Sequence, residues 1–333
     1  MESTKGKLLA LLEENRGQSL SGQELALRLG ISRAAVWKAM DGLKKEGHQI
    51  QGVNNKGYQL LEGSDVLTLA SMEPWLPKEY DRSLLHVYDT VESTNITARE
   101  LAAKGAPEGT AVVAARQERG KGRRGRAFFS PKGGVYVSMV LRPQLPAEES
   151  ARVTTTAAVQ ICRVLEEVCG FQAQIKWVND VMFRGKKICG ILTEGAIDLE
   201  SGMPEYIIVG IGVNLLEGVE GFPPELRQIA GALYRENLPQ GMTRGRFAAA
   251  MVEKMGAISA LCTAKETLEE YRRRCPLVGH RVMVMENEPW EGKVIAISDS
   301  CGLVVEKEDG SQRHLQSGEV SIRPGQEVWR KES

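Results

Sequence analysis

The spacing of hydrophobic residues changes character twice along the 333-residue chain, so one repeating pattern cannot describe its fold. Residues 3–62 show helical spacing followed by two short alternating segments, whereas residues 84–275 alternate between strand and helix patterns. Residues 280–322 contain only short strand patterns separated by turn residues. At about 150 residues per domain, the length suits two or three domains. We therefore predict three units, at residues 1–63, 66–275 and 278–329.

The first unit has the pattern of a winged helix-turn-helix. Two helices are predicted before residue 29, and Gly30 permits a tight turn after them. Ser32 is a suitable N-cap for a third helix over Arg33–Glu46. Two alternating segments over 48–61 predict a hairpin that forms the wing.

The third helix and the hairpin are expected to bind DNA. In this layout the helix N-terminus meets base edges and phosphates, and basic side chains neutralise the phosphates. The residues expected to contact DNA are Ser32, Arg33, Ala34, Trp37, Lys38, Lys44, Lys45 and Lys56. The alternative is a small helical domain whose charged face contacts another protein. Turn, wing and basic bias together favour DNA binding.

The central unit is predicted to be an α+β domain with a mixed sheet. Residues 63–82 contain Gly63, Pro74 and Pro77 and are predicted to form a linker into it. Strands are expected over 85–88, 111–115, 135–141, 173–178, 188–193 and 206–213, and helices over 96–104, 148–168, 244–261 and 265–274. Because regular crossover helices are missing between the strands, an α+β sheet is favoured over a doubly wound one.

The last unit is predicted to be a small SH3-like β-barrel. Its expected strands are 281–285, 293–298, 303–306, 312–315 and 319–322. Short strands at this spacing, with turn residues between them, are typical of such barrels.

Composition excludes several classes of protein. Lys and Arg together number 43, as do Asp and Glu, so zero net charge argues against a protein that binds nucleic acid over its whole surface. The longest apolar run, residues 207–216, is shorter than the roughly 18 residues that span a membrane. The N-terminus lacks the hydrophobic core of a signal peptide, so a cytoplasmic location and no membrane partner are expected. The six cysteines form no CxxC pair and the four histidines are isolated, so no metal site is predicted from them.

A run of glycine and basic residues over 120–125 reads literally as the dinucleotide-binding pattern GxGxxG. That pattern must open a helix, which Pro131 and the glycines after it forbid. A Walker A motif is also absent, because no Gly-Lys pair precedes Ser or Thr. Six basic residues lie within eleven positions: Arg116, Arg119, Lys121, Arg123, Arg124 and Arg126. The segment is a loop that binds phosphate and carboxylate groups, a disordered basic surface loop or a patch that binds nucleic acid.

Polar side chains stand where several predicted strands end or begin. Residues 93–95 offer hydroxyls and an amide between a strand and a helix. Asn179 and Asp180 end another strand, and a short hairpin brings Asp180 near Lys187. Asn214 ends a buried strand. Together with the basic loop, these residues describe a pocket for an anionic nucleotide.

The ordered set of these motifs resembles the family of bifunctional biotin–protein ligases that also repress biotin operons. The motifs are Glu-Ser-Thr-Asn at 92–95, Gln117 followed by Gly-Lys-Gly-Arg-Arg-Gly-Arg at 120–126, Phe-Ser-Pro at 129–131, Lys-Trp-x-Asn-Asp at 176–180, Lys-Ile-x-Gly-Ile-Leu-x-Glu at 187–194 and Gly-Ile-Gly-x-Asn at 210–214. With the winged helix before them and the small barrel after them, the resemblance covers nearly the whole chain.

The resemblance implies roles for the pocket residues. The biotin-binding residues are Ser93, Thr94, Asn95, Gln117, Lys121, Gly122, Arg123 and Lys187. The nucleotide-binding residues are Arg124, Arg126, Phe128, Asn179, Asn214, Phe222 and Arg323. Arg123, Lys187 and Asp180 are the implied catalytic residues, and Asp180 is also expected to hold Mg²⁺ through the phosphates of ATP.

Three positions depart from the family pattern. Lys121 stands where Arg is expected, Val178 where Pro is usual, and Phe128 where Trp is expected. A point charge replaces a bidentate guanidinium at the first position, and an indole N–H donor is lost at the last. We expect these changes to affect affinity or loop order and to leave the reaction unchanged.

The resemblance also implies the reaction and the partners. Biotin and ATP would give biotinyl-5′-AMP, and biotin would then pass to a lysine of a biotin carboxyl carrier protein, either a subunit of acetyl-CoA carboxylase or a domain of pyruvate carboxylase. Biotinyl-5′-AMP would act as corepressor for a homodimer on operator DNA. Two alternatives remain at this point: a related transferase of lipoate or octanoate, and a transcription factor whose ligand-sensing domain has lost catalysis.

Overall fold

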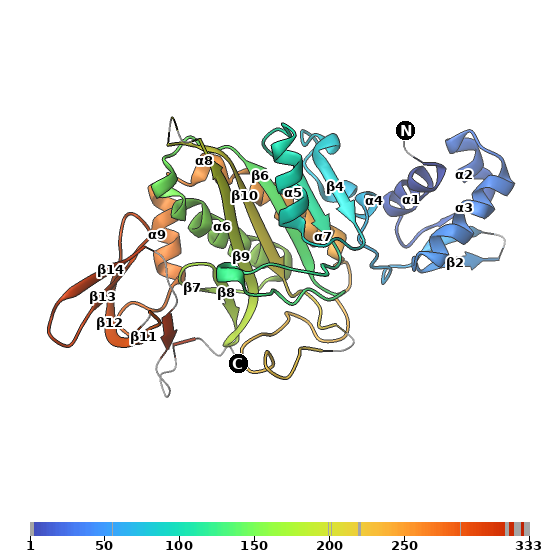
Figure 1. Ribbon diagram of the computed structural model, residues 1–333. Coiled ribbons are helices and arrows are strands. Elements are labelled where there is room, and N and C mark those ends of the chain that lie inside the picture. The colour runs from blue at the N-terminus through green and yellow to red at the C-terminus, as the bar shows by residue number, and fades with distance from the viewer. Residues whose placement is uncertain are drawn as a thin grey trace.

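The computed structural model describes residues 3–54, 56–198, 200, 202–218, 221–286, 288–316, 320–322 and 328–329. Figure 1 shows an N-terminal unit at one end of the molecule, a large sheet with its helices in the middle and a small sheet at the other end. This arrangement matches the order of the three predicted units.

The N-terminal unit is a winged helix-turn-helix, as predicted. Its elements are α1 (Thr4–Glu14), β1 (Ser19–Leu20), α2 (Gly22–Leu29), α3 (Arg33–Lys45), β2 (Ile50–Val53) and β3 (Gly57–Leu60). Gly30 ends α2 in the left-handed conformation at φ 63°, and the Ser32 hydroxyl accepts a hydrogen bond from Ala35 N at the start of α3. Leu8, Leu25 and Met40 are buried in a separate hydrophobic core. The short strand β1, which pairs with β3, was missed because two residues carry no periodicity.

The segment predicted as a linker is instead folded against both neighbouring units. It contains α4 (Leu69–Met72) and the 3₁₀ turns η1 (Glu73–Trp75) and η2 (Arg82–Leu84). Ala70 packs into the N-terminal core, whereas Met72 and Leu76 are buried in the core of the central unit. Asp65 accepts hydrogen bonds at 2.7 Å from both N and Nε of Arg244. The glycine and proline residues of this segment therefore indicated turns, whereas the apolar residues between them anchor the segment to the two neighbouring units.

The central unit is built on a seven-stranded mixed sheet in the order β4-β5-β6-β10-β9-β8-β7, in which only the β4–β5 pair is parallel. The strands are β4 (Leu85–Tyr88), β5 (Ala111–Ala114), β6 (Val135–Leu141), β7 (Gln174–Lys176), β8 (Asp180–Phe183), β9 (Lys186–Ile197) and β10 (Pro204–Val213). The helices are α5 (Thr94–Ala103), α6 (Ala151–Val164), α7 (Arg244–Gly256), α8 (Ile258–Leu261) and α9 (Lys265–Arg274), with short turns η3 (Arg123–Gly125), η4 (Ala147–Glu149) and η5 (Leu165–Cys169).

The two faces of this sheet are covered by different helices (Figure 1). Val112 and Ile208 pack with Ala98 of α5 on one face, while Val113 and Val209 belong to the main core with α6 and α7. Alternation along each strand places neighbouring residues on opposite faces. The α+β prediction with a mixed sheet is confirmed.

Several predicted boundaries were wrong. The helix predicted over 148–168 is divided into a 3₁₀ turn, α6 and the π-helical turn η5, and the helix over 244–261 is divided into α7 and α8. The strand predicted over 173–178 is only β7, because the chain turns at residues 177–179 to begin β8. The spacing of hydrophobic residues continues through these breaks, because the same side of the segment stays buried before and after each break. The spacing therefore does not reveal the breaks.

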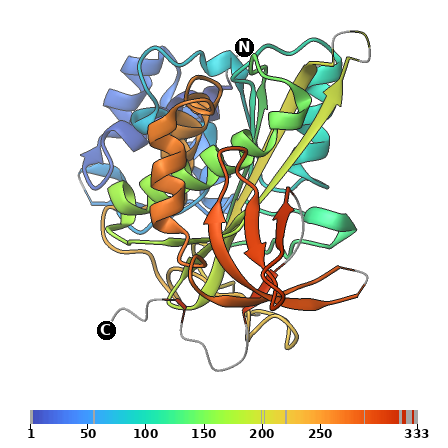
Figure 2. The same cartoon turned by 90° about the vertical axis from the view of Figure 1, so that its left-hand side faces the viewer.

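The C-terminal unit is a five-stranded antiparallel sheet in the order β14-β13-β12-β11-β15. Its strands are β11 (Arg281–Val284), β12 (Trp290–Ile297), β13 (Leu303–Glu306), β14 (Gln312–Leu315) and β15 (Val320–Ile322). The predicted first residue of the last strand, Glu319, lies outside the described residues. The sheet lies beside α9 (Figure 2), and its Cys301 carbonyl accepts a hydrogen bond from Trp177 Nε1 at 2.9 Å. No helix in the described part of the chain is both long and apolar enough to cross a membrane.

Candidate functional site

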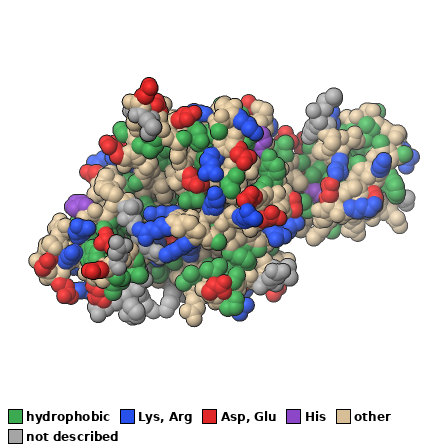
Figure 3. Space-filling model, in the orientation of Figure 1, with side chains coloured by type: hydrophobic (Ala, Val, Ile, Leu, Met, Phe, Trp, Pro, Cys, Tyr) green, Lys and Arg blue, Asp and Glu red, His purple; other side chains and the backbone are tan. Residues whose placement is uncertain are grey.

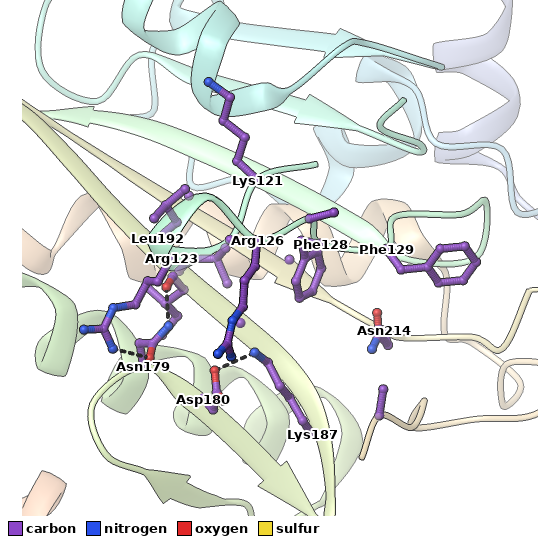
Figure 4. A pocket seen from close by; sticks show the side chains of 18 of the residues that line it. Lys121, Arg123, Arg126, Phe128, Phe129, Asn179, Asp180, Lys187, Leu192 and Asn214 are labelled. Atoms are coloured by element: carbon purple, nitrogen blue, oxygen red, sulfur yellow. Dashed lines mark hydrogen bonds and ion pairs between the residues drawn. The ribbon is translucent and has the colours of Figure 1, made fainter. Parts of the chain in front are cut away.

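A cavity of about 250 Å³ lies at the ends of the central strands, beneath the loop that joins β5 to β6 (Figure 4). Predicted pocket residues from several separate segments line it: Ser93, Thr94, Asn95, Gln117, Lys121, Gly122, Arg123, Arg124, Arg126, Phe128, Asn179, Asp180, Lys187, Asn214 and Phe222. Arg323, which was predicted on the nucleotide side, lies outside the described residues. The fold therefore brings together all of the predicted pocket residues that it describes.

The glycine-rich loop turns back on itself over the cavity. Phe128 N donates to Gly120 O at 2.8 Å, and Gly122 N donates to Arg126 O at 2.7 Å. A Cβ on Gly120 would overlap the Phe128 carbonyl, so this close approach needs glycine. Lys132, near the end of the loop, donates to Asp89 at 3.0 Å and holds the pKa of that carboxyl below its usual range.

The Phe128 ring covers two glycines of the sheet. Gly190 on β9 and Gly212 on β10 are register partners, and a Cβ at Gly212 would overlap the ring. Lys187 Nζ lies 5.9 Å from the centroid of the same ring. The ring therefore connects the loop to the strands that carry the charged side chains.

Buried hydroxyl and amide groups form a neutral end of the cavity. Thr94 N donates to Gln117 Oε1 at 2.8 Å, and Thr94 Oγ1 lies 3.0 Å from the same oxygen. Gln117 Nε2 donates to Ser130 Oγ at 3.0 Å, which fixes the orientation of the amide. Ser93 is the N-cap residue of α5, although its side chain makes no capping hydrogen bond.

Asn95 is held by two residues that the sequence did not single out as site residues. Its Oδ1 lies 2.6 Å from Ser138 Oγ, and its Nδ2 donates to Glu194 Oε2 at 2.7 Å. Ser138 is a hydroxyl inside the otherwise apolar strand β6, which is the one sequence signal that could have identified it.

Cations dominate the other end of the cavity. Among the described residues, the lining of the whole cavity contains six basic side chains and a single carboxylate: Lys121, Arg123, Arg124, Arg126, Lys176 and Lys187 against Asp180. Arg123, Arg126 and Lys187 gather near Asp180 at this end, whereas the Lys121 side chain points away from them (Figure 4). Lys187 Nζ lies 2.7 Å from Asp180 Oδ1, which confirms the proximity predicted from the hairpin. Arg123 Nη1 donates to Asn179 Oδ1 at 3.0 Å (Figure 4). Figure 3 shows basic side chains gathered at the middle of this face of the molecule. This end is suited to bind phosphate and carboxylate groups.

The side of the cavity beyond Lys187 is formed by a long loop after β10. Phe222 is buried there with its ring centroid 6.1 Å from that of Phe129, which also lines the cavity although it was not predicted as a site residue. Asn214 Nδ2 donates to Gly231 O at 3.1 Å, so this amide ties the strand end to the same loop. Val320 of β15 also reaches the cavity, which brings the C-terminal sheet into the site.

The residues present fit Mg²⁺ only in a site shared with a substrate. Within the described residues, no group of three or more His, Cys, Asp or Glu side chains could hold a metal ion. Asp180 supplies one carboxylate beside Asn179. Mg²⁺ commonly binds through one or two carboxylates together with phosphate oxygens and water, so this donor set suits a phosphate-bound ion.

The predicted DNA-binding residues lie on the surface of the N-terminal unit. Ser32, Arg33, Ala34, Trp37, Lys38, Lys44, Lys45 and Lys56 are all exposed. Trp37 is 64% exposed although it is a large hydrophobic residue, and it stands four residues after Arg33, on the same face of α3. An exposed aromatic and basic helix face is a surface that can enter a DNA groove.

Comparison with known families divides the chain as the fold does. Residues 5–59 match a helix-turn-helix domain, residues 87–214 match the biotin/lipoate A/B protein ligase family, and residues 281–323 match the biotin protein ligase C-terminal domain. The biotin protein ligase of Aquifex aeolicus, solved in complex with biotin and ATP, superimposes with a TM-score of 0.58 and 25% sequence identity, covering 72% of this chain and 98% of that one.

Two curated relatives carry both activities in their names. The bifunctional ligase/repressor BirA of Bacillus subtilis is 40% identical over 235 residues, which cover 70% of this chain and 72% of that protein. The bifunctional ligase/repressor BirA of Escherichia coli is 28% identical over 327 residues, 95% of this chain and 96% of that protein. By this similarity, and with its matches to these three domain families, the chain belongs to the family of bifunctional ligase/repressor proteins.

Proposed function

We propose that this protein is an ATP-dependent biotin–protein ligase that also represses biotin biosynthesis genes. The observation that carries the ligase assignment is the cavity itself, in which a neutral hydrogen-bonding end meets a cationic end. Biotin has this polarity, since its ring urea is neutral and its carboxylate is anionic. ATP brings further negative charge to the cationic end.

The first step forms biotinyl-5′-AMP. A carboxylate oxygen of biotin forms a bond to the α-phosphorus of ATP, the bond to the bridging oxygen breaks, and pyrophosphate leaves. Arg123 and Lys187 place positive charge where negative charge increases in the transition state. When bound, Mg²⁺ supplies charge neutralisation at the phosphates, and Asp180 with Asn179 would hold it.

The second step transfers biotin. The neutral amine of a lysine on the carrier domain attacks the acyl carbon of the adenylate, and the bond from that carbon to the phosphate oxygen breaks. AMP leaves, and the nitrogen loses a proton to water as the amide forms. The loop that carries Phe128 covers the anhydride and excludes water from it. No protein nucleophile takes part in these steps, and burial raises the pKa of the Cys189 thiol well above its usual value, so this thiol remains protonated.

The roles of the remaining residues follow the polarity of the cavity. Biotin is bound through Ser93, Thr94, Gln117, Lys121 and Gly122 together with Arg123 and Lys187, with Asn95 beside them. The nucleotide is bound by Arg124, Arg126, Phe128, Asn179, Asn214 and Phe222, and Arg323 is proposed to join them.

The repressor function is assigned to the N-terminal unit. One winged helix reads a short half-site, so we propose a homodimer on a two-fold operator, with biotinyl-5′-AMP as corepressor. The exposed basic face of α3 supports DNA binding. We propose domain boundaries at residues 1–63, 66–275 and 278–329, and an SH3-like barrel as the C-terminal domain. We also propose a cytoplasmic location, because ATP and operator DNA are present there.

Pyrophosphate release from biotin and ATP tests the ligase assignment. We expect release to require biotin, to be unsupported by lipoate, and to fall at least about tenfold in Lys187→Met, because a charge-assisted bond contributes roughly 1.5–3 kcal/mol. Lys104→Met, an exposed lysine at the end of α5, is the matched control and should release pyrophosphate at the wild-type rate. Lipoate-dependent release would favour the related transferase, and a protein without any release would favour a ligand sensor that has lost catalysis.

Titration of DNA from upstream of the biotin biosynthesis genes tests the repressor assignment. At fixed salt, biotin plus ATP should tighten binding by a coupling of roughly 1–3 kcal/mol. Lys38→Ala should weaken binding and reduce its salt dependence, because one phosphate contact is lost. An affinity unchanged by biotin plus ATP would refute the corepressor role while leaving the ligase assignment in place.

A further inference from the structure

The hydrogen bonds at the neutral end of the cavity continue beyond it to Glu194. Glu194 is on β9, two residues after the cavity-lining Leu192, and it does not line the cavity itself. Its Oε2 accepts from Asn95 Nδ2 at 2.7 Å, and its Oε1 lies 3.9 Å from Arg99 Nη1. A carboxylate therefore stands at the outer end of the polar network.

A carboxylate oxygen only accepts hydrogen bonds, so it determines how the Asn95 amide is turned. The NH₂ group faces Glu194 and also lies 3.5 Å from Leu192 O, a second acceptor. The amide oxygen must then face the other way, toward Ser138 Oγ at 2.6 Å. The orientation of this amide is thus set from outside the cavity.

The Ser138 hydroxyl transmits this orientation to Thr94. Ser138 Oγ lies 2.6 Å from Asn95 Oδ1 and 2.7 Å from Thr94 Oγ1, but it has one proton. Because the amide oxygen cannot donate, the proton goes to Asn95 and the Ser138 oxygen can accept from Thr94. The Thr94 proton is then taken by Ser138 or by Gln117 Oε1, which lies 3.0 Å away. The Thr94 oxygen is left with lone pairs for a ligand.

We infer that Glu194 is a positioning residue that makes the neutral end of the cavity an acceptor for a ring N–H of the ligand. The inference rests on the proposed function and extends it to ligand selection. The ring urea of biotin carries N–H donors, whereas the dithiolane ring of lipoate has none. The role of Asn95 is then indirect, because the hydrogen bonds of its amide are made within the protein.

The opposite orientation would weaken this selectivity. If the Asn95 amide turned over, its NH₂ group would donate to Ser138, and the Ser138 proton would occupy a lone pair of Thr94. The Thr94 proton would have only the longer contact to Gln117, so it could donate to a ligand instead. Glu194 prevents this state because a carboxylate cannot donate to the Asn95 oxygen.

Exchange of the two polar groups tests the inference. Asn95→Asp places two carboxylates together, whereas the double variant Glu194→Gln with Asn95→Asp restores one donor and one acceptor in reversed positions and still accepts the Ser138 proton. Glu194→Gln alone allows both orientations of the Asn95 amide. Glu205→Gln, on the exposed part of the neighbouring strand β10, is the matched control.

The probes are biotin and its two cyclic carbamate isomers, in which oxygen replaces one ring N–H, and binding is measured by calorimetry.

The informative quantity is the ratio of the affinity for biotin to the affinity for the carbamate that binds more weakly. Wild type and Glu205→Gln should bind biotin at least about 100-fold more tightly than the weaker carbamate, since a buried acceptor rejects a second acceptor. The ratio should fall about tenfold in Glu194→Gln and further in Asn95→Asp, and it should return to within about tenfold of wild type in the double variant.

Two outcomes would overturn the inference. A ratio that is equal in all of the variants would show that Glu194 has only a structural role, and a double variant no better than Asn95→Asp would show that the polarity of the pair is irrelevant. In both cases wild type still binds biotin, so the proposed function stands. A wild-type protein that binds no biotin would instead remove the proposed function and the inference together.

Discussion

Arg123 connects the loop to the turn between β7 and β8. Its guanidinium donates to Asn179 Oδ1 at 3.0 Å and lines the cationic end of the cavity. We predict that Arg123→Ala releases biotinyl-5′-AMP about 10- to 100-fold faster while biotin binding changes less, because charge-assisted bonds contribute roughly 1.5–3 kcal/mol. Release can be followed by displacement of labelled adenylate. Arg119→Ala, in the same loop with its side chain 80% exposed, is the control, and release no faster than wild type would contradict the prediction.

At the same scale, we predict that His48 makes the stability of the N-terminal unit depend on pH. His48 is buried, its Nδ1 has no hydrogen-bond partner among the described residues, and burial lowers its pKa below the usual 6.5. Glu46 opposes this lowering, whereas Arg16 and Lys5 add to it. The unfolded chain therefore binds a proton that the folded chain does not, so stability is complete above pH 6.5 and decreases as the pH falls below it.

The measurement is the free energy of unfolding at pH 7.5 and 5.5. Between pH 7.5 and 5.5, the free energy of unfolding of wild type should fall by up to about 1.4 kcal/mol for each unit by which the pKa of His48 is lower in the folded chain than in the unfolded chain. His48→Gln should not show this loss. His314→Gln, at an exposed histidine, should behave as wild type. Glu13, whose pKa is raised by burial, contributes the opposite trend, but it does so equally in all of the proteins. A pH dependence that survives in His48→Gln would rule out His48 as its source.

At the scale of elements, the loop between β5 and β6 combines exposed cationic side chains with a fold that depends on glycine. Arg119, Lys121, Arg124, Arg126 and Lys132 are exposed. Like charges disfavour one fixed loop conformation without an anion. We predict that trypsin cuts the loop between residues 119 and 132 and that biotin plus ATP protects it, as read from fragment masses. Cleavage within α9 serves as the reference, and equal loop cleavage with and without ligand would count against an anion-binding loop.

Strand β10 is predicted to need glycine where it passes under α5. A Cβ on Gly210 would overlap Asn95 Oδ1, so Gly210→Ala must displace the amide that contacts Ser138 and Glu194. We expect biotin affinity to fall by about tenfold or more through loss of these hydrogen bonds. Gly256→Ala, where the added Cβ meets nothing within 4 Å, is the control, and calorimetric titration with biotin distinguishes the two. Normal biotin affinity in folded Gly210→Ala would show that this amide position is not needed.

At the scale of the whole molecule, separate hydrophobic cores make the DNA-binding unit removable. Leu8, Leu25 and Met40 belong to the N-terminal core, whereas Met72 and Leu76 belong to the central one. We predict that deletion of residues 1–62 abolishes DNA binding and leaves pyrophosphate release largely intact. Deletion of residues 1–82 should instead lower the melting temperature strongly, because it also removes large side chains from the central core. Loss of adenylate synthesis in a well-folded 63–333 protein would show that the two units act together.

Local patterns in the sequence determined the elements of this protein and the chemistry of its cavity. Helix caps such as Ser32, alternating strands, and polar residues at strand ends are encoded within a few positions, so the winged helix, the mixed sheet and the Asp180–Lys187 pair were predictable. Contacts between distant segments were not predictable in this way. Asn95 meets Glu194 across 99 positions of sequence, Ser138 meets Thr94 across 44, and Val320 reaches the cavity from the last described strand. These contacts depend on the order of strands in the sheet and on the side chains that each face presents. The packing of the whole chain determines the strand order and these faces. The tertiary structure is therefore needed to show how the hydrogen bonds at the neutral end of the cavity are oriented.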